Sequence, residues 1–316
     1  MKSGDMAQAS HGLGLSCSMR SVERTPGHTL LVGCGYVGAR LARKLGGVAR
    51  ALVRTSASSQ ALASEGIPAQ AADLDQLQPG VAMGPPPEAV VYLAPPQASG
   101  TEDVRLARCL AALEAARPRV LIYLSTTGVY GDAGGGRVDE DTPPRPIEDR
   151  SRRRLDAEAR AAAWSAERGA RCVLLRVPAI YGPFRLPLDR LQRGEPVLRE
   201  EDSGPGNRIH VDDLVGACLA ALSGEASGVF NLVDGDGRSF GAFQDALADL
   251  AGLPRPRRVD WAEAQRLLSP GLLAFLRESR RVSSRRSREL GWTPTYGDPG
   301  EGIRACLTEM GWKPGP

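Results

Sequence analysis

Apolar positions in the first half of the chain follow two alternating patterns. Short, nearly continuous apolar runs are typical of strands buried on both faces of a sheet, and they lie at 30–32, 89–94, 120–124 and 172–177. Segments that read as helices lie between these runs, at 36–45, 101–116 and 148–168. This alternation of strands and helices predicts an α/β fold, in which a parallel sheet carries helices on both faces.

We expect two further strands in the first half of the chain, at 48–53 and 67–72. The pattern becomes looser after residue 178, where we expect strands at 228–233 and 255–261 and helices at 211–222 and 240–250. The chain is therefore divided into a polar extension at 1–27, which we expect to be disordered, a sheet domain at 28–178, and a smaller mixed α/β region at 179–316 that is interleaved with the sheet domain.

The turn after the first predicted strand reads Gly33-Cys34-Gly35-Tyr36-Val37-Gly38 and leads into the helix at 36–45. Gly33 permits a tight turn, Gly35 lets the backbone approach a pyrophosphate, and Gly38 lets the helix pack closely on the strand. The pyrophosphate would bind the free N–H groups at the start of that helix. This context predicts a dinucleotide-binding Rossmann domain with a doubly wound parallel sheet. A packing turn without a ligand, or a flavin or S-adenosylmethionine site, is the alternative.

The residue that ends the second predicted strand indicates which dinucleotide binds. An acidic residue there would bind the ribose 2′-hydroxyl of NAD. This chain has Arg54, followed by Thr55, Ser56 and Ser58. A guanidinium with nearby hydroxyls would hold a 2′-phosphate, so we expect NADP as the preferred cofactor and NAD as the alternative.

Composition narrows the function classes. The chain has 316 residues and a net charge of +3, which is too small a positive charge to indicate nucleic-acid binding. Its six cysteines form no Cys-x-x-Cys pair, so we expect reduced thiols, a cytoplasmic location and no metal site. No apolar run is long enough to span a membrane, and residues 1–27 lack the apolar centre of a signal peptide. Met6 and Met19 are alternative starts.

Further motifs follow the glycine turn in a fixed order. They are Ala72-Asp73-Leu74, Tyr92-Leu93-Ala94, Leu124-Ser125-Thr126-Thr127-Gly128-Val129-Tyr130-Gly131, Leu175-Arg176-Val177-Pro178-Ala179-Ile180-Tyr181-Gly182-Pro183, Arg208-Ile209-His210-Val211-Asp212-Asp213-Leu214, Phe230-Asn231-Leu232 and Arg288-Glu289-Leu290-Gly291-Trp292-Thr293-Pro294. Together they resemble the extended short-chain dehydrogenase/reductase family, the NAD(P)-dependent epimerase/dehydratase group. The resemblance runs from about Thr29 to Gly311.

The resemblance implies roles for individual residues. Asp73 and Leu74 would contact adenine, Leu93 and Ala94 would line the cofactor, and the segment from Pro178 to Tyr181 would flank the nicotinamide. The smaller region at 179–316 would bind the substrate. These residues lie at carboxyl ends of predicted strands, where ligands of doubly wound sheets bind.

The resemblance also implies residues on the substrate side. Thr126, with Ser125 beside it, would hydrogen-bond the reacting oxygen, although strand-end capping is the alternative interpretation of both residues. His210 would shape the substrate pocket or simply begin a helix, and Tyr130 would lie near the substrate.

The chain departs from the family at the catalytic pair. Family catalysis relies on a Tyr and a Lys four residues later, on the helix after the fifth strand. Here Arg150 and Arg154 occupy these positions. Arg154 can still hold ribose hydroxyls or phosphate, but a guanidinium at position 150 cannot donate a proton. The glycine turn is also one residue shorter than is usual for the extended group. Both differences point to the atypical branch of the family, which often lacks the Tyr.

Two hypotheses for function follow. In the first, the protein is an NAD(P)-dependent oxidoreductase or epimerase/dehydratase-like enzyme that acts on a small carbonyl, hydroxyl or sugar-type substrate. Tyr181, Tyr130 or His210 would then replace the missing proton donor, and position in the chain favours Tyr181. The alternative interpretation of Tyr181 is a tyrosine packed at the edge of the core. In the second, the protein is a catalytically weak NADP(H)-binding sensor.

The run from Arg277 to Arg288 contains six arginines. It reads as a solvated helix face or as a cap over an anionic substrate. No aromatic residues interleave, so nucleic acid is not an expected partner. We expect a small-molecule substrate, no membrane partner, and a homodimer as one oligomeric state open to the chain.

Overall fold

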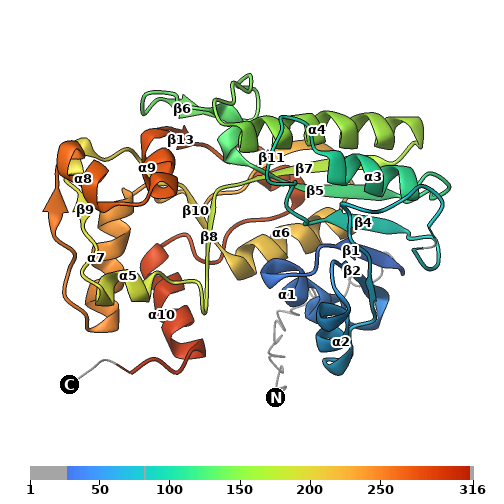
Figure 1. The fold of residues 1–316 in the computed structure, drawn as a ribbon, viewed down its shortest axis with the longest axis horizontal. Helices are drawn as coiled ribbons and strands as arrows, with labels where there is room; N and C mark the ends of the chain where they lie inside the picture. Colours follow the sequence, from blue (N-terminus) through green and yellow to red (C-terminus); the bar gives the residue numbers. More distant parts are fainter. Residues whose placement is uncertain (1–26, 82, 314–316) are drawn as a thin grey trace, which may run out of the picture.

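The computed structural model describes residues 27–81 and 83–313 (Figure 1). Apart from Gly27, the extension expected at 1–27 lies outside the described residues. Seven parallel strands form the central sheet in the order β3-β2-β1-β4-β5-β7-β11. Their bounds are β1 Thr29–Val32, β2 Ala49–Val53, β3 Ala69–Ala71, β4 Ala89–Tyr92, β5 Val120–Thr126, β7 Arg171–Val177 and β11 Gly228–Asn231. The doubly wound Rossmann sheet predicted from the sequence is confirmed.

Helices cover both faces of this sheet (Figure 1). One face carries α1 (Tyr36–Leu45), α2 (Ser56–Ser64) and α6 (Val211–Ser223), and the other carries α3 (Val104–Ala112) and α4 (Asp149–Glu167). Alternate residues of the central strands supply the two cores, which is why the strands are apolar throughout. In β1, Leu31 faces the α1 side, whereas Leu30 and Val32 face the α3 side, and all three are fully buried.

A smaller lobe packs beside the carboxyl end of the sheet, on the left in Figure 1. Its helices are α5 Leu188–Gln192, α7 Phe240–Ala251, α8 Trp261–Leu267, α9 Pro270–Arg277 and α10 Pro299–Glu309. Its short parallel strand pairs are β8 (Ala179–Tyr181) with β10 (Arg208–His210), β9 (Val197–Leu198) with β12 (Arg258–Val259), and β6 (Arg137–Val138) with β13 (Arg281–Val282). Single 3₁₀ turns lie at η2 Gly46–Val48, η3 Thr127–Tyr130, η4 Glu200–Asp202 and η5 Ser287–Leu290.

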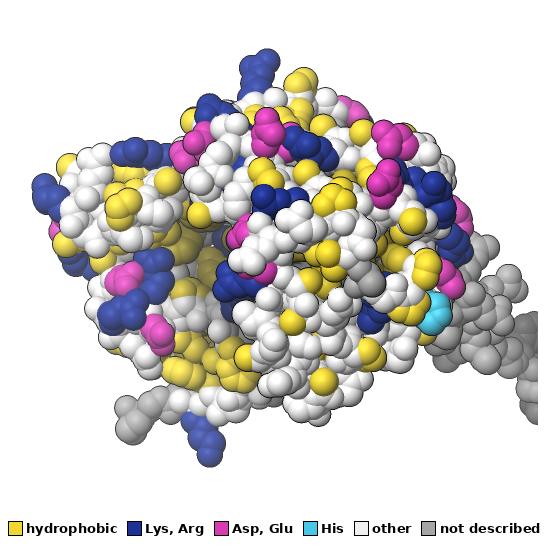
Figure 2. Space-filling view, turned by 45° about the vertical axis from the view of Figure 1, so that its right-hand side comes forward, with side chains coloured by type: hydrophobic (Ala, Val, Ile, Leu, Met, Phe, Trp, Pro, Cys, Tyr) yellow, Lys and Arg dark blue, Asp and Glu magenta, His cyan; other side chains and the backbone are white. Residues whose placement is uncertain are grey.

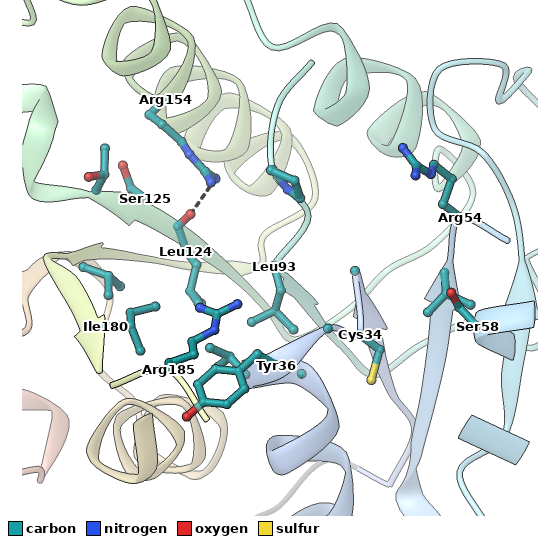
Figure 3. Close-up of a pocket in the computed structure, with 18 of the residues that line it drawn as sticks. Cys34, Tyr36, Arg54, Ser58, Leu93, Leu124, Ser125, Arg154, Ile180 and Arg185 are labelled. Carbon is teal, nitrogen blue, oxygen red and sulfur yellow. Dashed lines mark hydrogen bonds between the residues drawn. The ribbon is translucent and has the colours of Figure 1, made fainter. Parts of the chain in front are cut away.

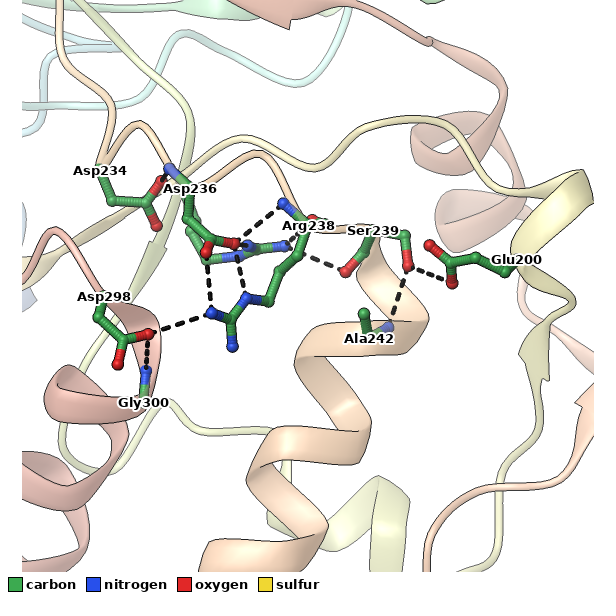
Figure 4. A network of polar contacts seen from close by, with 9 residues as sticks. Glu200, Asp234, Asp236, Arg238, Ser239, Ala242, Asp298 and Gly300 are labelled. Carbon is green, nitrogen blue, oxygen red and sulfur yellow. Dashed lines mark hydrogen bonds and ion pairs between the residues drawn. The ribbon is translucent and has the colours of Figure 1, made fainter.

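Polar contacts fix the loop after β11 to the small lobe (Figure 4). Arg238 Nη2 lies 2.8 Å from Asp236 Oδ2 and 3.1 Å from Asp298 Oδ1. Ser239 begins α7: its Oγ accepts a hydrogen bond from Ala242 N at 3.0 Å. The neighbouring Asp234 is buried, with its Oδ2 unpaired, and this burial raises the pKa of Asp234 to about 6.

Several elements differ from their prediction. The helix expected at 101–116 begins only at Val104, because Asp103 caps it by accepting a hydrogen bond from Leu106 N at 2.9 Å. The strand expected at 255–261 is reduced to β12. Helix α2 was missed, because its Ser- and Ala-rich sequence buries Leu62 alone among its residues and gives little periodicity.

Of the two interpretations of the arginine run at 277–288, the first, a solvated helix face, is wrong, and the second, a cap over an anionic substrate, stays a prediction. Helix α9 ends at Arg277, and the run continues into strand β13 and the turn η5. Arg280 is buried, and its charge is compensated there: the guanidinium donates to Gly131 O at 2.6 Å and lies 2.9 Å from Glu278. None of the helices in the described part of the chain is both long and apolar enough to cross a bilayer.

Candidate active site

The three glycines of the first turn are required for different structural reasons. Gly33 has φ +87°, and a Cβ there would lie 2.6 Å from Ala94 N, so this position needs glycine for the fold. A Cβ at Gly38 would lie 3.0 Å from Gly33 O and 3.2 Å from Leu93, so Gly38 permits close packing of α1. A Cβ at Gly35 would meet no atom within 4 Å. The protein itself leaves this space open, as a pyrophosphate site requires.

Helix α1 begins directly above this open space. Gly35 is its N-cap, no side chain caps the helix, and its first turn carries no acidic residue. The first N–H groups of the helix therefore face the cleft without a side-chain acceptor, and the positive end of the helix dipole adds to their attraction for an anion.

Two adjoining cavities run along the carboxyl edge of the sheet. The larger, of about 510 Å³, is drawn in Figure 3. The predicted residues that line it are Gly33, Gly35, Tyr36, Val37, Gly38, Arg54, Leu93, Ser125, Thr126, Arg154 and Pro178. The second, of about 310 Å³, is lined by the predicted residues Asp73, Leu74 and Ala94, and shares Gly33 and Arg54 with the first. The structure thus brings most of the predicted site residues together.

The larger cavity is strongly cationic. Arg54, Arg154 and Arg185 line it, and no Asp or Glu is among its described lining residues. Figure 3 shows Arg54 with Ser58 at one end of the cleft, and Arg154 near Leu124 at the other. The molecular surface is hollowed between the small lobe and the sheet, with basic side chains at the edge of the hollow (Figure 2). A cavity with this charge favours an anionic ligand.

A buried ion pair fixes the end of β5. Ser125 Oγ donates to Glu158 Oε1 at 2.5 Å, and Glu158 Oε2 lies 2.7 Å from Arg176 Nη2. The side chains of Glu158 and Arg176 are only 5% and 4% exposed. The Ser125 hydroxyl is thus committed to Glu158, so it positions the strand rather than facing a ligand as a free donor.

Thr126 is the better placed of the two hydroxyl residues. Its Oγ1 accepts a hydrogen bond from Gly128 N at 3.1 Å, which caps the turn η3. The hydroxyl proton of Thr126 is not used in this contact, so it remains available to a ligand oxygen in the cleft. The capping role and the ligand role are therefore compatible.

The two arginines that we expected at the family's catalytic positions have different surroundings. Arg154 lines the cleft, where its Nη1 donates to Leu124 O at 2.9 Å and to Tyr123 Oη at 3.1 Å. Arg150 lies one helical turn earlier on α4, is exposed, and does not line either cavity.

Three residues were expected to serve as proton donors in place of the family's tyrosine, and all three lie outside both cavities. Tyr181 is 5% exposed and packs in the core of the small lobe, and this burial raises the pKa of its hydroxyl well above the ordinary range. His210 is 1% exposed and caps α6, with its Nδ1 accepting from Asp212 N at 3.2 Å; burial lowers the pKa of its ring. Tyr130 Oη donates to Asn231 Oδ1 at 2.9 Å. The structure does not place these groups with Thr126.

Sequence reasoning missed Arg185, which lines the cleft from the segment between β8 and α5. Its guanidinium Cζ lies 4.2 Å from the centre of the Tyr36 ring. Nothing in the local pattern distinguishes Arg185 from a solvated loop arginine, because its position depends on the packing of the small lobe against α1.

Comparisons with known proteins show similarity in sequence and in overall fold. A 3-diazoavenalumate denitrifying reductase from a Streptomyces species is 31% identical over 223 residues, which are 67% of this chain and 71% of the relative. A functionally unknown conserved protein from Silicibacter pomeroyi has a solved structure with a TM-score of 0.73 and 28% identity, covering 90% of this chain and 99% of that one.

A UDP-glucose 4-epimerase from Thermotoga maritima, solved with UDP-glucose, shares the fold. Its TM-score is 0.71 at 20% identity, covering 89% of this chain and 97% of that one. Residues 29–232 match the NAD dependent epimerase/dehydratase family. With the parallel sheet, the three-glycine turn and the cationic cleft already described, this match assigns the chain to the NAD dependent epimerase/dehydratase family.

Proposed function

We propose that this protein is an NADP(H)-dependent reductase that acts on a small carbonyl compound or a comparable hydride acceptor. The observation that carries the proposal is the larger cleft, which holds the open Gly35 turn, the uncapped start of α1 and three arginines, with no Asp or Glu among its described lining residues. This set of groups suits a dinucleotide that carries an additional phosphate.

The residues present fit the phosphates, the adenine and the nicotinamide ribose of the cofactor. The N–H groups of α1 would hold the pyrophosphate in the space that Gly35 leaves open. Arg54 and Ser58, at the end of the cleft beside the smaller cavity, would hold the 2′-phosphate. Asp73 and Leu74 would line the adenine, and Arg154 would hold the nicotinamide ribose. When bound, NADPH supplies a hydride.

Reduction suits this site better than epimerisation. An epimerase must remove a proton from a substrate hydroxyl and return it, and Arg150, at the family's tyrosine position, is an exposed guanidinium outside the cavities. A reductase needs only to stabilise the oxygen that gains charge. Thr126 can donate a hydrogen bond from its hydroxyl to that oxygen, while Ser125, Glu158 and Arg176 keep the end of β5 in place. Solvent then supplies the proton.

The relative that is 31% identical is named a reductase, which supports the same choice. The test is direct: NADPH affinity is measured by fluorescence titration, and oxidation of NADPH is then followed by absorbance with aldehydes, ketones, a diazo compound and UDP-glucose. We expect oxidation with at least one acceptor of the first three classes and none with UDP-glucose. If neither NADPH nor NADH binds, the proposal is wrong.

A catalytically weak NADP(H) sensor is the second candidate. Two observations favour it: position 150 holds a guanidinium rather than a proton donor, and the Ser125 hydroxyl already donates its hydrogen bond to Glu158. Stoichiometric NADPH binding with no oxidation by any acceptor in the panel would select the sensor over the reductase.

A further inference from the structure

We propose that Arg185 is a clamp for the pyrophosphate of the dinucleotide, which it binds from the side opposite the glycine turn. The inference rests on the proposed cofactor site. It assigns to the small lobe a part in holding the cofactor that the glycine turn and Arg54 do not supply.

A strained turn directs Arg185 into the cleft. Phe184 has φ +62°, and it is the one non-glycine residue with positive φ in the described part of the chain. Arg185 N donates to Gly182 O at 3.0 Å, and Phe184 N donates to Met310 Sδ at 3.2 Å. Phe184 (74% exposed) and Arg185 are both exposed residues, but Arg185 lines the cavity and Phe184 does not. Backbone strain of this kind is retained where the neighbouring structure needs the conformation, and here it separates the two side chains.

The same turn is fastened to the start of α1. Tyr36, the first residue of α1, donates from its hydroxyl to Pro183 O at 2.8 Å. A Cβ at Gly182 would lie 2.3 Å from this hydroxyl, so glycine is required for the close approach. The Arg185 guanidinium stacks on the Tyr36 ring, and Figure 3 shows it between that ring and Leu124. Arg185 therefore lies over the same helix end whose N–H groups would bind the pyrophosphate.

The charge of Arg185 is not neutralised by any ion pair among the described residues. Arg40, which lies on the same Tyr36 ring with its Cζ 5.5 Å from the ring centre, is different, because it pairs with Asp212 at 3.1 Å and with Glu309 at 2.5 Å. Arg40 also does not line the cleft. Arg40 is thus held in structural ion pairs, whereas the charge of Arg185 is available to an anionic ligand. The ring holds the guanidinium in position, which lowers the entropic cost of closing on a phosphate.

The test uses the full chain and measures affinity rather than turnover. Dissociation constants for NADPH, NADH and adenosine 2′-monophosphate are determined for wild type, Arg185→Gln, Arg54→Gln and the control Arg193→Gln, an exposed arginine outside the cavities. Arg185→Gln should weaken NADPH and NADH by the same factor, roughly ten- to hundredfold, because one charge-assisted contact to a phosphate is lost. It should leave adenosine 2′-monophosphate unchanged, since that probe has no pyrophosphate.

The comparison variants make the result specific. Arg54→Gln should weaken NADPH and adenosine 2′-monophosphate but not NADH, and Arg193→Gln should change none of the three. Circular dichroism and a melting curve check that each variant is folded, and Arg185→Lys should recover part of the loss. If Arg185→Gln binds NADPH as wild type does, or weakens NADPH without weakening NADH, the clamp is wrong. If wild type binds neither dinucleotide, the proposed cofactor site itself has failed.

Discussion

Substitution of Gly35 separates the ligand role of the glycine turn from its structural role. Gly35 has φ −87°, and no atom lies within 4 Å of a Cβ built there. Gly35→Val should therefore change the free energy of unfolding by no more than about 1 kcal/mol, because a poorer N-cap is offset by the reduced entropy of the unfolded chain. The protein should fold and melt nearly as wild type does.

Cofactor binding should behave differently. The valine side chain would occupy the space in which the pyrophosphate meets the N–H groups of α1. The loss of two charge-assisted hydrogen bonds, each worth about 1.5–3 kcal/mol, amounts to roughly 3–6 kcal/mol. At 1.4 kcal/mol for each tenfold change, the affinity for NADPH should fall by about two to four orders of magnitude. Fluorescence titration with NADPH and thermal denaturation of the same samples measure both effects.

Gly33→Val is the matched control in the same turn. Gly33 has φ +87°, and its Cβ would lie 2.6 Å from Ala94 N. Left-handed backbone costs a non-glycine residue about 1–2 kcal/mol, and overpacking adds roughly 1–3 kcal/mol, so this variant should lose about 2–5 kcal/mol of stability. A Gly35→Val protein that melts normally and still binds NADPH with wild-type affinity would refute the placement of the pyrophosphate.

Four other changes test the remaining parts of the site and its support. Arg54→Asp should lower NADPH affinity and raise the NADH/NADPH affinity ratio at least tenfold, because a carboxylate repels a 2′-phosphate; an unchanged ratio means that Arg54 does not contact that phosphate. Thr126→Val should leave NADPH affinity unchanged and lower kcat by roughly 10²–10³, and full activity would remove Thr126 from the mechanism. Glu158→Gln should lower the free energy of unfolding, measured by urea denaturation, by about 3–5 kcal/mol, because Arg176 is left buried without its partner 2.7 Å away. The double variant Glu158→Leu with Arg176→Met should lose less stability, because no buried charge is left unpaired. Asp234→Asn should raise the free energy of unfolding above pH 6 by about 3 kcal/mol. The pKa of Asp234 in the folded state is raised to about 6, so wild type loses stability as the pH rises from about 4 to 6. The stability advantage of the variant should therefore disappear as the pH falls from about 6 to about 4. A pH-independent difference between the Asp234→Asn variant and wild type would contradict this reasoning.

The sequence by itself determined the sheet and one end of the site. The apolar runs of β1, β4, β5 and β7 and the glycine turn predict a Rossmann domain, because strands buried on both faces must be continuously apolar and because a strand can meet a helix so closely only at glycine. Residues at strand ends, such as Thr126 and Asp73, could be placed at the edge of the sheet for the same reason. These features follow from local spacing, which the sequence displays directly.

The tertiary structure alone decided which polar side chains face the cleft. Tyr181 and His210 were both predicted as site residues from the sequence, but packing in the small lobe turns both side chains into its interior. Arg185 has no distinguishing local pattern, and only the contact of its turn with Tyr36 brings it over α1. The physical reason is that burial and charge compensation depend on which distant segments meet, whereas backbone geometry and helix or strand periodicity are set by neighbours in the chain.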